Sequence, residues 1–155
     1  MIGASITAVL AAAVALYLNA IGRKNEDRSR RRGLYSEAYR TALEWCEGVY
    51  RVRRRAPDGS EDRALVAHFH ELQERIAYYQ GWLCIEAAEL GRSYQHFLDR
   101  VLEECRPLIQ QAWEDPGRNP TDPTPEGETV PQLDQDKETF LREVRKHQAR
   151  WWETV

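Results

Sequence analysis

The first 22 residues carry no charged side chain, and this feature constrains the chain more than any other. Residues 1–21 read MIGASITAVLAAAVALYLNAI. That is about the twenty residues that a helix needs to cross a hydrocarbon core roughly 30 Å thick. Tyr17 lies near one end, where an interfacial aromatic is expected. Residues 1–22 therefore predict an N-terminal transmembrane helix, and their many alanines would let such helices approach one another closely.

A basic juxtamembrane segment, residues 23–33, follows directly and carries Arg23, Lys24, Arg28, Arg30, Arg31 and Arg32. By the positive-inside rule, the C-terminal part is cytoplasmic and the N-terminus lies outside. The alternative is a signal peptide cleaved near Leu18-Asn19-Ala20. Such peptides begin with a basic region, whereas no basic residue precedes this apolar run. We expect a single-pass protein of the cell (inner) membrane.

The net charge of −3 conceals a division between two parts of the chain. Residues 23–56 have a net charge of +6, and residues 57–155 have a net charge of −9. The basic segment is expected to fix the topology and also to contact lipid headgroups, because each Lys or Arg beside an anionic leaflet contributes about 1 kcal/mol. Only three of the 22 basic residues are lysine, which together with the alanine content is typical of a GC-rich bacterial genome. No nucleic-acid-binding motif accompanies the basic residues, so nucleic acid is not an expected partner.

Helical periodicity continues through residues 34–113, which predict a helical hairpin or bundle. A first stretch from about residue 25 to 55 has one apolar stripe, and Pro57-Asp58-Gly59-Ser60 then ends it, with Asp58 or Ser60 available to cap the next helix. A second stripe has steps of three or four at Leu65, Phe69, Leu72, Ile76, Tyr79, Leu83, Ala87, Leu90, Tyr94, Phe97, Val101, Cys105, Leu108 and Ala112. This second stripe indicates one very long helix or two nearly collinear helices.

Residues 114–131 contain five prolines and predict an extended linker. Residues 132–155 predict a C-terminal amphipathic helix with apolar positions at Leu133, Phe140, Leu141, Val144, Trp151 and Trp152. Helices joined by short loops pack as antiparallel neighbours by default. The predicted fold is all-α: the transmembrane helix followed by an elongated up-down bundle or coiled-coil-like hairpin with the C-terminal helix, closed within the chain or by a second copy.

The sequence offers little for catalysis or for a cofactor. His68 and His70 are two residues apart and would point to different helix faces, and no third ligand stands near the His70–Glu74 or Glu143–His147 pairs. There is no glycine-rich phosphate loop and no GxSxG motif. Three scattered cysteines form no disulfide framework, which fits a reducing compartment. We expect no catalytic residues, no metal site and no cofactor.

Aromatic and basic clusters are the candidates for a partner interface: Tyr78, Tyr79 and Trp82, then Arg53, Arg54 and Arg55, and last Trp151 and Trp152. The aromatic side chains lie on two faces around Gly81, and rings off the main stripe are buried either in the bundle itself or against a partner. The arginines follow the end of a helix, where cations also satisfy the last carbonyl groups.

These features favour a membrane-anchored cytoplasmic scaffold, adaptor or accessory subunit that acts through helix–helix contacts with a partner protein or with itself. The alternative is a membrane-tethered sensor or regulatory module that binds a small ligand inside its bundle. A buried polar cavity would favour the sensor, and an apolar seam would favour the scaffold. The sequence names neither the partner, nor the process, nor the oligomeric number.

Overall fold

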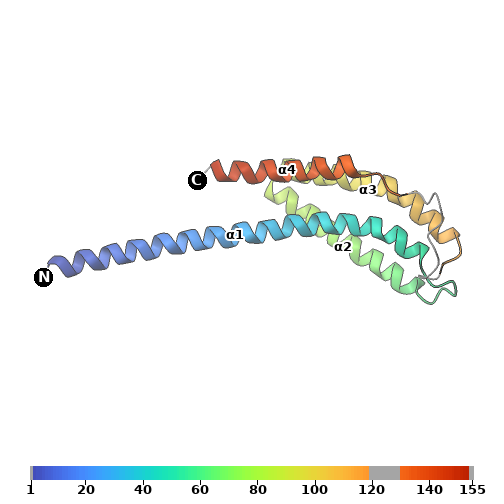
Figure 1. Ribbon diagram of the computed structural model, residues 1–155, viewed down its shortest axis with the longest axis horizontal. Coiled ribbons are helices and arrows are strands. Elements are labelled where there is room, and N and C mark those ends of the chain that lie inside the picture. The colour runs from blue at the N-terminus through green and yellow to red at the C-terminus, as the bar shows by residue number, and fades with distance from the viewer. Residues whose placement is uncertain (1, 119–129, 154–155) are drawn as a thin grey trace. The chain divides into compact units, whose positions relative to one another are not determined.

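The computed structural model describes residues 2–118 and 130–153, and all regular secondary structure in these ranges is α-helical (Figure 1). The helices are α1 (Ile2–Arg53), α2 (Asp62–Glu86), α3 (Ala88–Glu114) and α4 (Asp134–Glu153). Side chains are described for residues 16–118 and 130–150. The predicted all-α class is therefore confirmed. The chain divides into two units, Met1–Ser36 and Glu37–Val155.

The first unit is the N-terminal part of α1. Its backbone is helical from Ile2 without a break at Gly22 or Gly33, so the predicted anchor and the basic segment belong to one helix. Most of the predicted anchor, residues 1–15, lies outside the described side chains. Among the residues that the structure describes, no helix is both long enough and apolar enough to cross a membrane. The membrane-spanning part of the prediction therefore receives no support from them.

The second unit is an up-down bundle, as predicted. Residues 37–53 of α1, then α2, α3 and α4 run in alternating directions (Figure 1). Residues 115–118 and 130–133 connect α3 to α4 without helix, and the rest of the predicted proline-rich linker lies outside the described residues. The C-terminal helix begins at Asp134, two residues later than expected. The helices therefore assemble into a bundle within a single chain.

The second stripe is neither one long helix nor two collinear helices, and that prediction is wrong. The chain reverses at one extended residue, Ala87, with φ −162° and ψ 132°. The two helices then meet so closely that a Cβ on Gly91 would lie 2.5 Å from the Sγ of Cys84 and 2.8 Å from its Cα. Glycine at position 91 therefore permits the reversal, because any side chain there would collide with α2.

The core contains most of the predicted stripe residues, while Leu65, Phe69, Ile76, Tyr79, Ala87 and Leu108 of the second stripe are half-buried. Its buried apolar residues in the second unit are Ala38, Ala42, Trp45, Val49, Val52, Leu72, Leu83, Leu90, Tyr94, Phe97, Leu98, Val101, Cys105, Ala112, Leu133, Phe140 and Val144. The Phe140 ring of α4 stacks on the Phe97 ring of α3, with centroids 5.6 Å apart and planes 8° from parallel. Full burial of a large apolar side chain contributes roughly 1.5–3 kcal/mol. The C-terminal helix therefore covers α3, as its length predicts.

The turn between α1 and α2 differs in detail from the prediction. The carboxylate of Asp58 accepts hydrogen bonds from the backbone N–H (3.0 Å) and the hydroxyl (2.7 Å) of Ser60, which closes the turn on itself. Gly59 has φ +72°, a conformation that favours glycine. Because these side chains are used within the turn, neither caps α2, whose N-cap residue is Glu61 and which has no side-chain cap. The capping prediction is wrong for that reason.

Candidate functional site

The last turns of α2 present an exposed face without charged residues, formed by Ala77, Tyr78, Gly81, Cys84 and Ile85 and called the α2 face below. At 100° per residue these five positions span an arc of about 120°. Ile85 is 88% exposed and Tyr78 is 61% exposed. A Cβ on Gly81 would meet nothing within 4 Å, so the face has open space at its centre.

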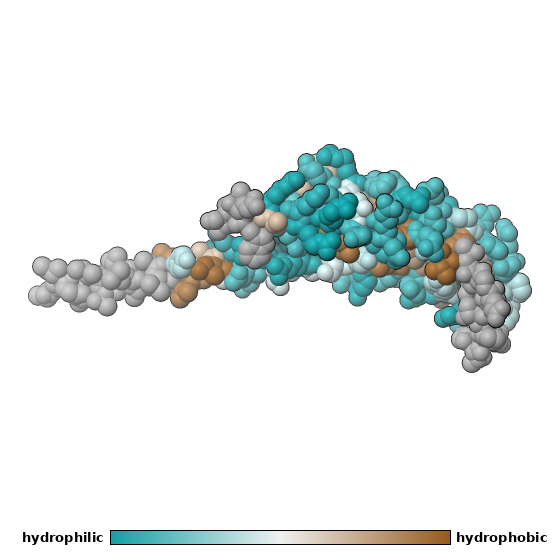
Figure 2. Space-filling model, turned by 45° about the horizontal axis from the view of Figure 1, so that its top comes forward, coloured by the Kyte–Doolittle hydropathy of each residue, from teal (hydrophilic) through white to brown (hydrophobic). Residues whose placement is uncertain are grey.

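Large exposed apolar side chains on one face mark a contact surface more often than scattered ones do. The uncharged run on α2 begins after the exposed Glu74, and Glu89 and Arg92 are exposed in the first turns of α3 that follow it. Hydrophilic residues make up most of the coloured surface that is visible in Figure 2. The α2 face therefore has the composition of an interface centre within a polar rim.

The other two aromatic candidates lie at the edge of this face. Tyr79 and Trp82 are half-buried, and the Tyr79 ring meets the Tyr78 ring edge-on at 5.2 Å between centroids. Burial, and next the carboxylate of Glu37, raise the pKa of Tyr79. Tyr79 and Trp82 are thus partly packed within the bundle, whereas Tyr78 is exposed on the α2 face.

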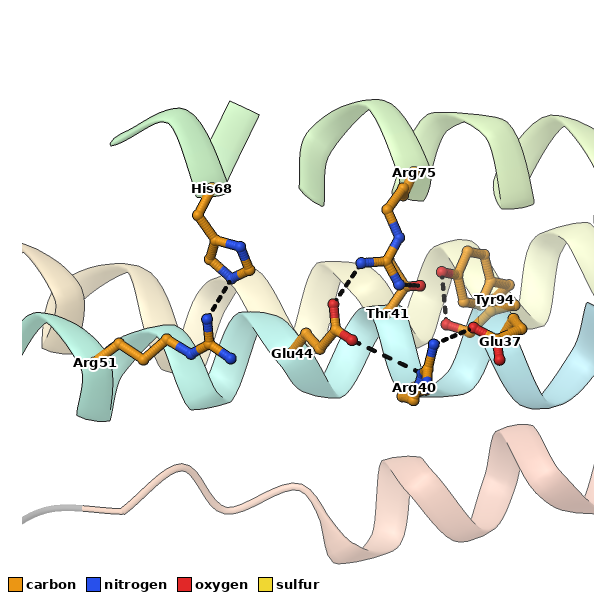
Figure 3. Close-up of polar contacts among 9 residues, drawn as sticks. Glu37, Arg40, Thr41, Glu44, Arg51, His68, Arg75 and Tyr94 are labelled. Carbon is orange, nitrogen blue, oxygen red and sulfur yellow. Dashed lines mark hydrogen bonds and ion pairs between the residues drawn. The ribbon is translucent and has the colours of Figure 1, made fainter. Parts of the chain in front are cut away.

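Polar side chains fill the seam between α1 and α2 (Figure 3). The guanidinium of Arg75 on α2 donates to the Glu44 carboxylate at 2.6 Å and to the buried Thr41 hydroxyl at 2.9 Å. Arg40 donates to Glu37 at 2.6 Å and lies 3.8 Å from Glu44. Arg75 therefore pairs across helices and fixes the register of α2 against α1.

Tyr94 of α3 reaches the same region from the core. Its hydroxyl donates to the carbonyl oxygen of Ala38 at 3.0 Å (Figure 3). Burial raises the pKa of Tyr94 well above its usual value. The hydroxyl is therefore held protonated as a donor to α1.

A groove of about 530 Å³ also lies between α1 and α2, lined by Glu47, Tyr50, Arg51, Arg54, Glu61, Ala64, Leu65 and His68. A nitrogen of Arg51 lies 3.3 Å from Nε2 of His68 across it (Figure 3). The lining holds as many carboxylates as guanidinium groups, so it has no excess charge to select a ligand. We therefore regard the α2 face, rather than this groove, as the candidate site.

The three consecutive arginines at the end of α1 have three different environments. Arg54 is exposed in the groove, and Arg53 is half-buried, with its carbonyl oxygen accepting from the backbone N–H of Arg118 at 3.2 Å. Arg55 is only 8% exposed. Its guanidinium donates to the carbonyl oxygens of Val52 (2.8 Å), Ala112 (2.6 Å), Trp113 (3.1 Å) and Asp115 (2.7 Å). Arg55 therefore joins the end of α1 to the end of α3.

The remaining predicted residues lie elsewhere. In the first unit, Arg23, Lys24, Arg30 and Arg32 are exposed, and Arg28 and Arg31 are partly exposed. Trp151 and Trp152 belong to α4, but their side chains are outside those described. Within the described residues, no group of three or more His, Cys, Asp or Glu side chains is placed to hold a metal ion.

Sequence reasoning found Tyr78 but missed the other members of the α2 face. Gly81 was noted only as the centre of the aromatic cluster, Ala77 and Cys84 are small, and Ile85 follows Leu83 and Cys84 in an apolar run, so none of them was singled out as exposed. A helical wheel of residues 77–86 shows one uncharged arc opposite the buried Leu83, but Arg63 and Glu74 fall on the same arc in the earlier turns of α2. No family model matches the chain, and no curated protein or solved structure is significantly similar to it.

Proposed function

We propose that the protein is a single-pass, membrane-anchored cytoplasmic scaffold whose helical bundle self-associates through the α2 face. The observation that carries the proposal is the exposure of Ile85 and Tyr78 beside the open notch at Gly81. Burying such side chains against a second protein removes apolar area from water. Rigid aromatic and aliphatic anchors of this kind supply most of the binding energy of typical interfaces.

A second copy fits this face because large and small side chains alternate around Gly81. In an antiparallel pair of α2 helices with the two-fold axis at Gly81, Ile85 of one copy faces Ala77 of the other, and Tyr78 faces Cys84. Each large side chain then meets a small one, which allows the helices to approach closely. Two-fold symmetry requires a self-complementary surface of this type.

Membrane anchoring rests on the sequence and on the start of the described side chains. Residues 1–22 carry no charge and a basic segment follows them. Leu16, Tyr17 and Leu18 are 68%, 67% and 61% exposed, and Figure 2 shows apolar surface on α1 next to its grey N-terminal residues. Adjacent exposed apolar side chains need an apolar environment. A lipid bilayer provides it, and the basic segment favours the cytoplasmic side for the bundle.

The α1–α2 seam is polar rather than apolar, so the preference for a scaffold over a small-ligand sensor rests on whether its polar groups are already paired. Arg75, Glu44 and Thr41 bond one another, and Tyr94 is bonded to the backbone, so these polar groups are already satisfied without a ligand. A ligand site would leave some of them to be satisfied by the ligand.

Self-association is tested by measuring the mass of the full chain in detergent micelles over a range of concentrations, by light scattering. Ile85→Asp should raise the dissociation constant about 30-fold, which corresponds to a hot spot of about 2 kcal/mol. Val66→Asp is the matched control, because Val66 is also exposed on α2 but lies outside the α2 face. A bismaleimide should join two chains through the exposed Cys84, and this product should disappear with Ile85→Asp.

A monomer at every concentration would contradict the proposal. So would a dimer that Ile85→Asp leaves unchanged, since the transmembrane segments would then be sufficient. Gentle extraction from native membranes and mass determination add a further test: a stoichiometric foreign protein in place of a second copy would make the chain an adaptor or subunit. Anchoring itself predicts that the chain stays in the membrane pellet after alkaline carbonate washing.

A further inference from the structure

Two cysteines that are far apart in the sequence meet inside the bundle. Cys46 lies on α1 and Cys105 on α3, and their Sγ atoms are 3.3 Å apart, with the Cys105 thiol donating to the Cys46 sulfur. Cys105 is fully buried, whereas Cys46 is partly exposed. Cys84, the third cysteine, is exposed on α2. The buried pair is therefore separate from the α2 face.

The two thiols of this pair are not equivalent. The hydrogen bond from Cys105 lowers the pKa of Cys46, and the positive charge of Lys137 on α4 acts in the same direction. The same hydrogen bond, and then burial, raise the pKa of Cys105. The thiolate is the nucleophilic form of cysteine. Cys46, which is also the more accessible of the two, is therefore the sulfur that reacts first.

We propose that Cys46 and Cys105 form a redox-active dithiol that a hydroperoxide oxidises to an intramolecular disulfide. The Cys46 thiolate attacks one peroxide oxygen, the O–O bond breaks, and Cys46 becomes a sulfenic acid while hydroxide leaves. The Cys105 sulfur then attacks the Cys46 sulfur, and the S–O bond breaks. The displaced hydroxide takes the Cys105 proton, and the first hydroxide takes the proton that Cys46 lost on ionising. Two thiols and one hydrogen peroxide therefore give one disulfide and two waters.

Geometry favours this second step. A disulfide has an S–S length of about 2.05 Å, so the two sulfur atoms must approach by about 1.2 Å. Side-chain rotation and a small shift of α1 against α3 provide such a movement. Because Cys105 is already in contact with Cys46, it competes with further peroxide for the sulfenic acid. In a reducing compartment such a bond is transient, and it serves as a sensor rather than as a permanent brace.

The disulfide would lock α1 onto α3 around a loop that contains the whole of α2. Cross-linking so long a loop restricts the unfolded chain strongly. We expect the melting temperature of the second unit to rise on the order of 10 °C on oxidation. An oxidative signal would thereby stabilise the cytoplasmic bundle against unfolding.

The test uses the full chain with Cys84→Ser, purified in detergent under reducing conditions. After treatment with equimolar hydrogen peroxide, the protein is denatured, alkylated with N-ethylmaleimide and weighed by mass spectrometry. The expected product has lost two hydrogens, carries no alkyl group and regains two alkylation sites after reduction. Adding Cys46→Ser or Cys105→Ser should prevent this product, and Cys105→Ser should leave a sulfenic acid at Cys46 that dimedone traps.

Three outcomes would overturn the proposal. Two alkyl groups on the peroxide-treated protein would show that the pair does not react. Over-oxidation of Cys46 to sulfinic acid in the chain that retains Cys105 would show that Cys105 does not resolve the intermediate. A disulfide that leaves the melting temperature unchanged would show that the link does not lock the bundle. The comparison of oxidised and reduced forms of one chain avoids dependence on variants that fail to fold.

Discussion

Arg55→Ala tests whether one buried guanidinium holds the end of the bundle together. The guanidinium donates to four carbonyl oxygens, and its carbon lies 4.9 Å from the centroid of the Trp113 ring. The Val52 carbonyl keeps the backbone N–H of residue 55 as a donor at 3.4 Å, so only three carbonyls lose their donor. The buried Ala112 carbonyl then costs at least about 1 kcal/mol, and we take about half of that for each of the two partly exposed carbonyls. The cation–π contact contributes about 1 kcal/mol. We expect a loss of about 3 kcal/mol in the free energy of unfolding.

The assay is urea unfolding of the full chain in detergent, followed by tryptophan fluorescence and circular dichroism. Arg54→Ala is the matched control, because it removes the same charge one residue away from an exposed position, and we expect a change within about 0.5 kcal/mol. Arg55→Lys should recover only part of the loss, since a lysine ammonium lacks the planar fork that reaches several carbonyls. Equal destabilisation by Arg55→Ala and Arg54→Ala would refute the role assigned to Arg55.

Two further predictions concern backbone fit and pH. Gly91→Ala should destabilise the protein by about 1–3 kcal/mol, because the added Cβ would collide with Cys84. Gly81→Ala has open space around it and should stabilise the helix by up to about 1 kcal/mol. Thermal unfolding of both variants measures the difference, and an equal effect of the two substitutions would contradict the close contact at the reversal. Because burial raises the pKa of Tyr94 above its usual 10, the unfolded chain loses this proton before the folded one, so stability is complete below pH 10 and falls as the pH rises further. Tyr94→Phe should flatten that fall in urea unfolding at pH 9, 10 and 11, and a slope like that of the wild type would count against this assignment.

The helical segments could be predicted from the sequence because apolar residues recur at steps of three or four where a helix faces the core. It did not predict the reversal at Ala87, since folding a striped helix back on itself keeps both halves facing the same core. Ala87 is neither glycine nor proline, and a glycine inside a helical stripe, such as Gly91, ordinarily indicates only a weaker helix. Gly91 is visible in the sequence, but the reason for a glycine there is the close approach of Cys84 from α2, which only the structure shows.

Contacts between groups that are distant in the sequence, and the exposure of the α2 face, were less predictable for the same reason. Arg55 belonged to a visible basic cluster, but most of its carbonyl partners lie 57–60 residues away in the chain. The contact between Cys46 and Cys105 likewise depends on how α1 crosses α3. The angular position of Ile85 opposite Leu83 can be read from the sequence, but its exposure depends on where the other helices pack. Sequence periodicity thus predicted which face of each helix is buried, whereas contacts between residues that are distant in the sequence were seen only in the structure.

The one-residue reversal at Ala87 also determines where the protein can tolerate inserted residues. An added residue between Ile85 and Ala87 would turn the preceding part of α2 by about 100° relative to the corner, which would separate Cys84 from Gly91 and misdirect Ile85. The opposite end of α2 has no such restriction, because Pro57, Asp58, Gly59 and Ser60 are all exposed. Exposed turns of this kind accept extra residues with little cost. Epitope tags, reporter domains and natural insertions therefore belong at the Asp58–Gly59 turn, and the Ala87 corner must keep its length.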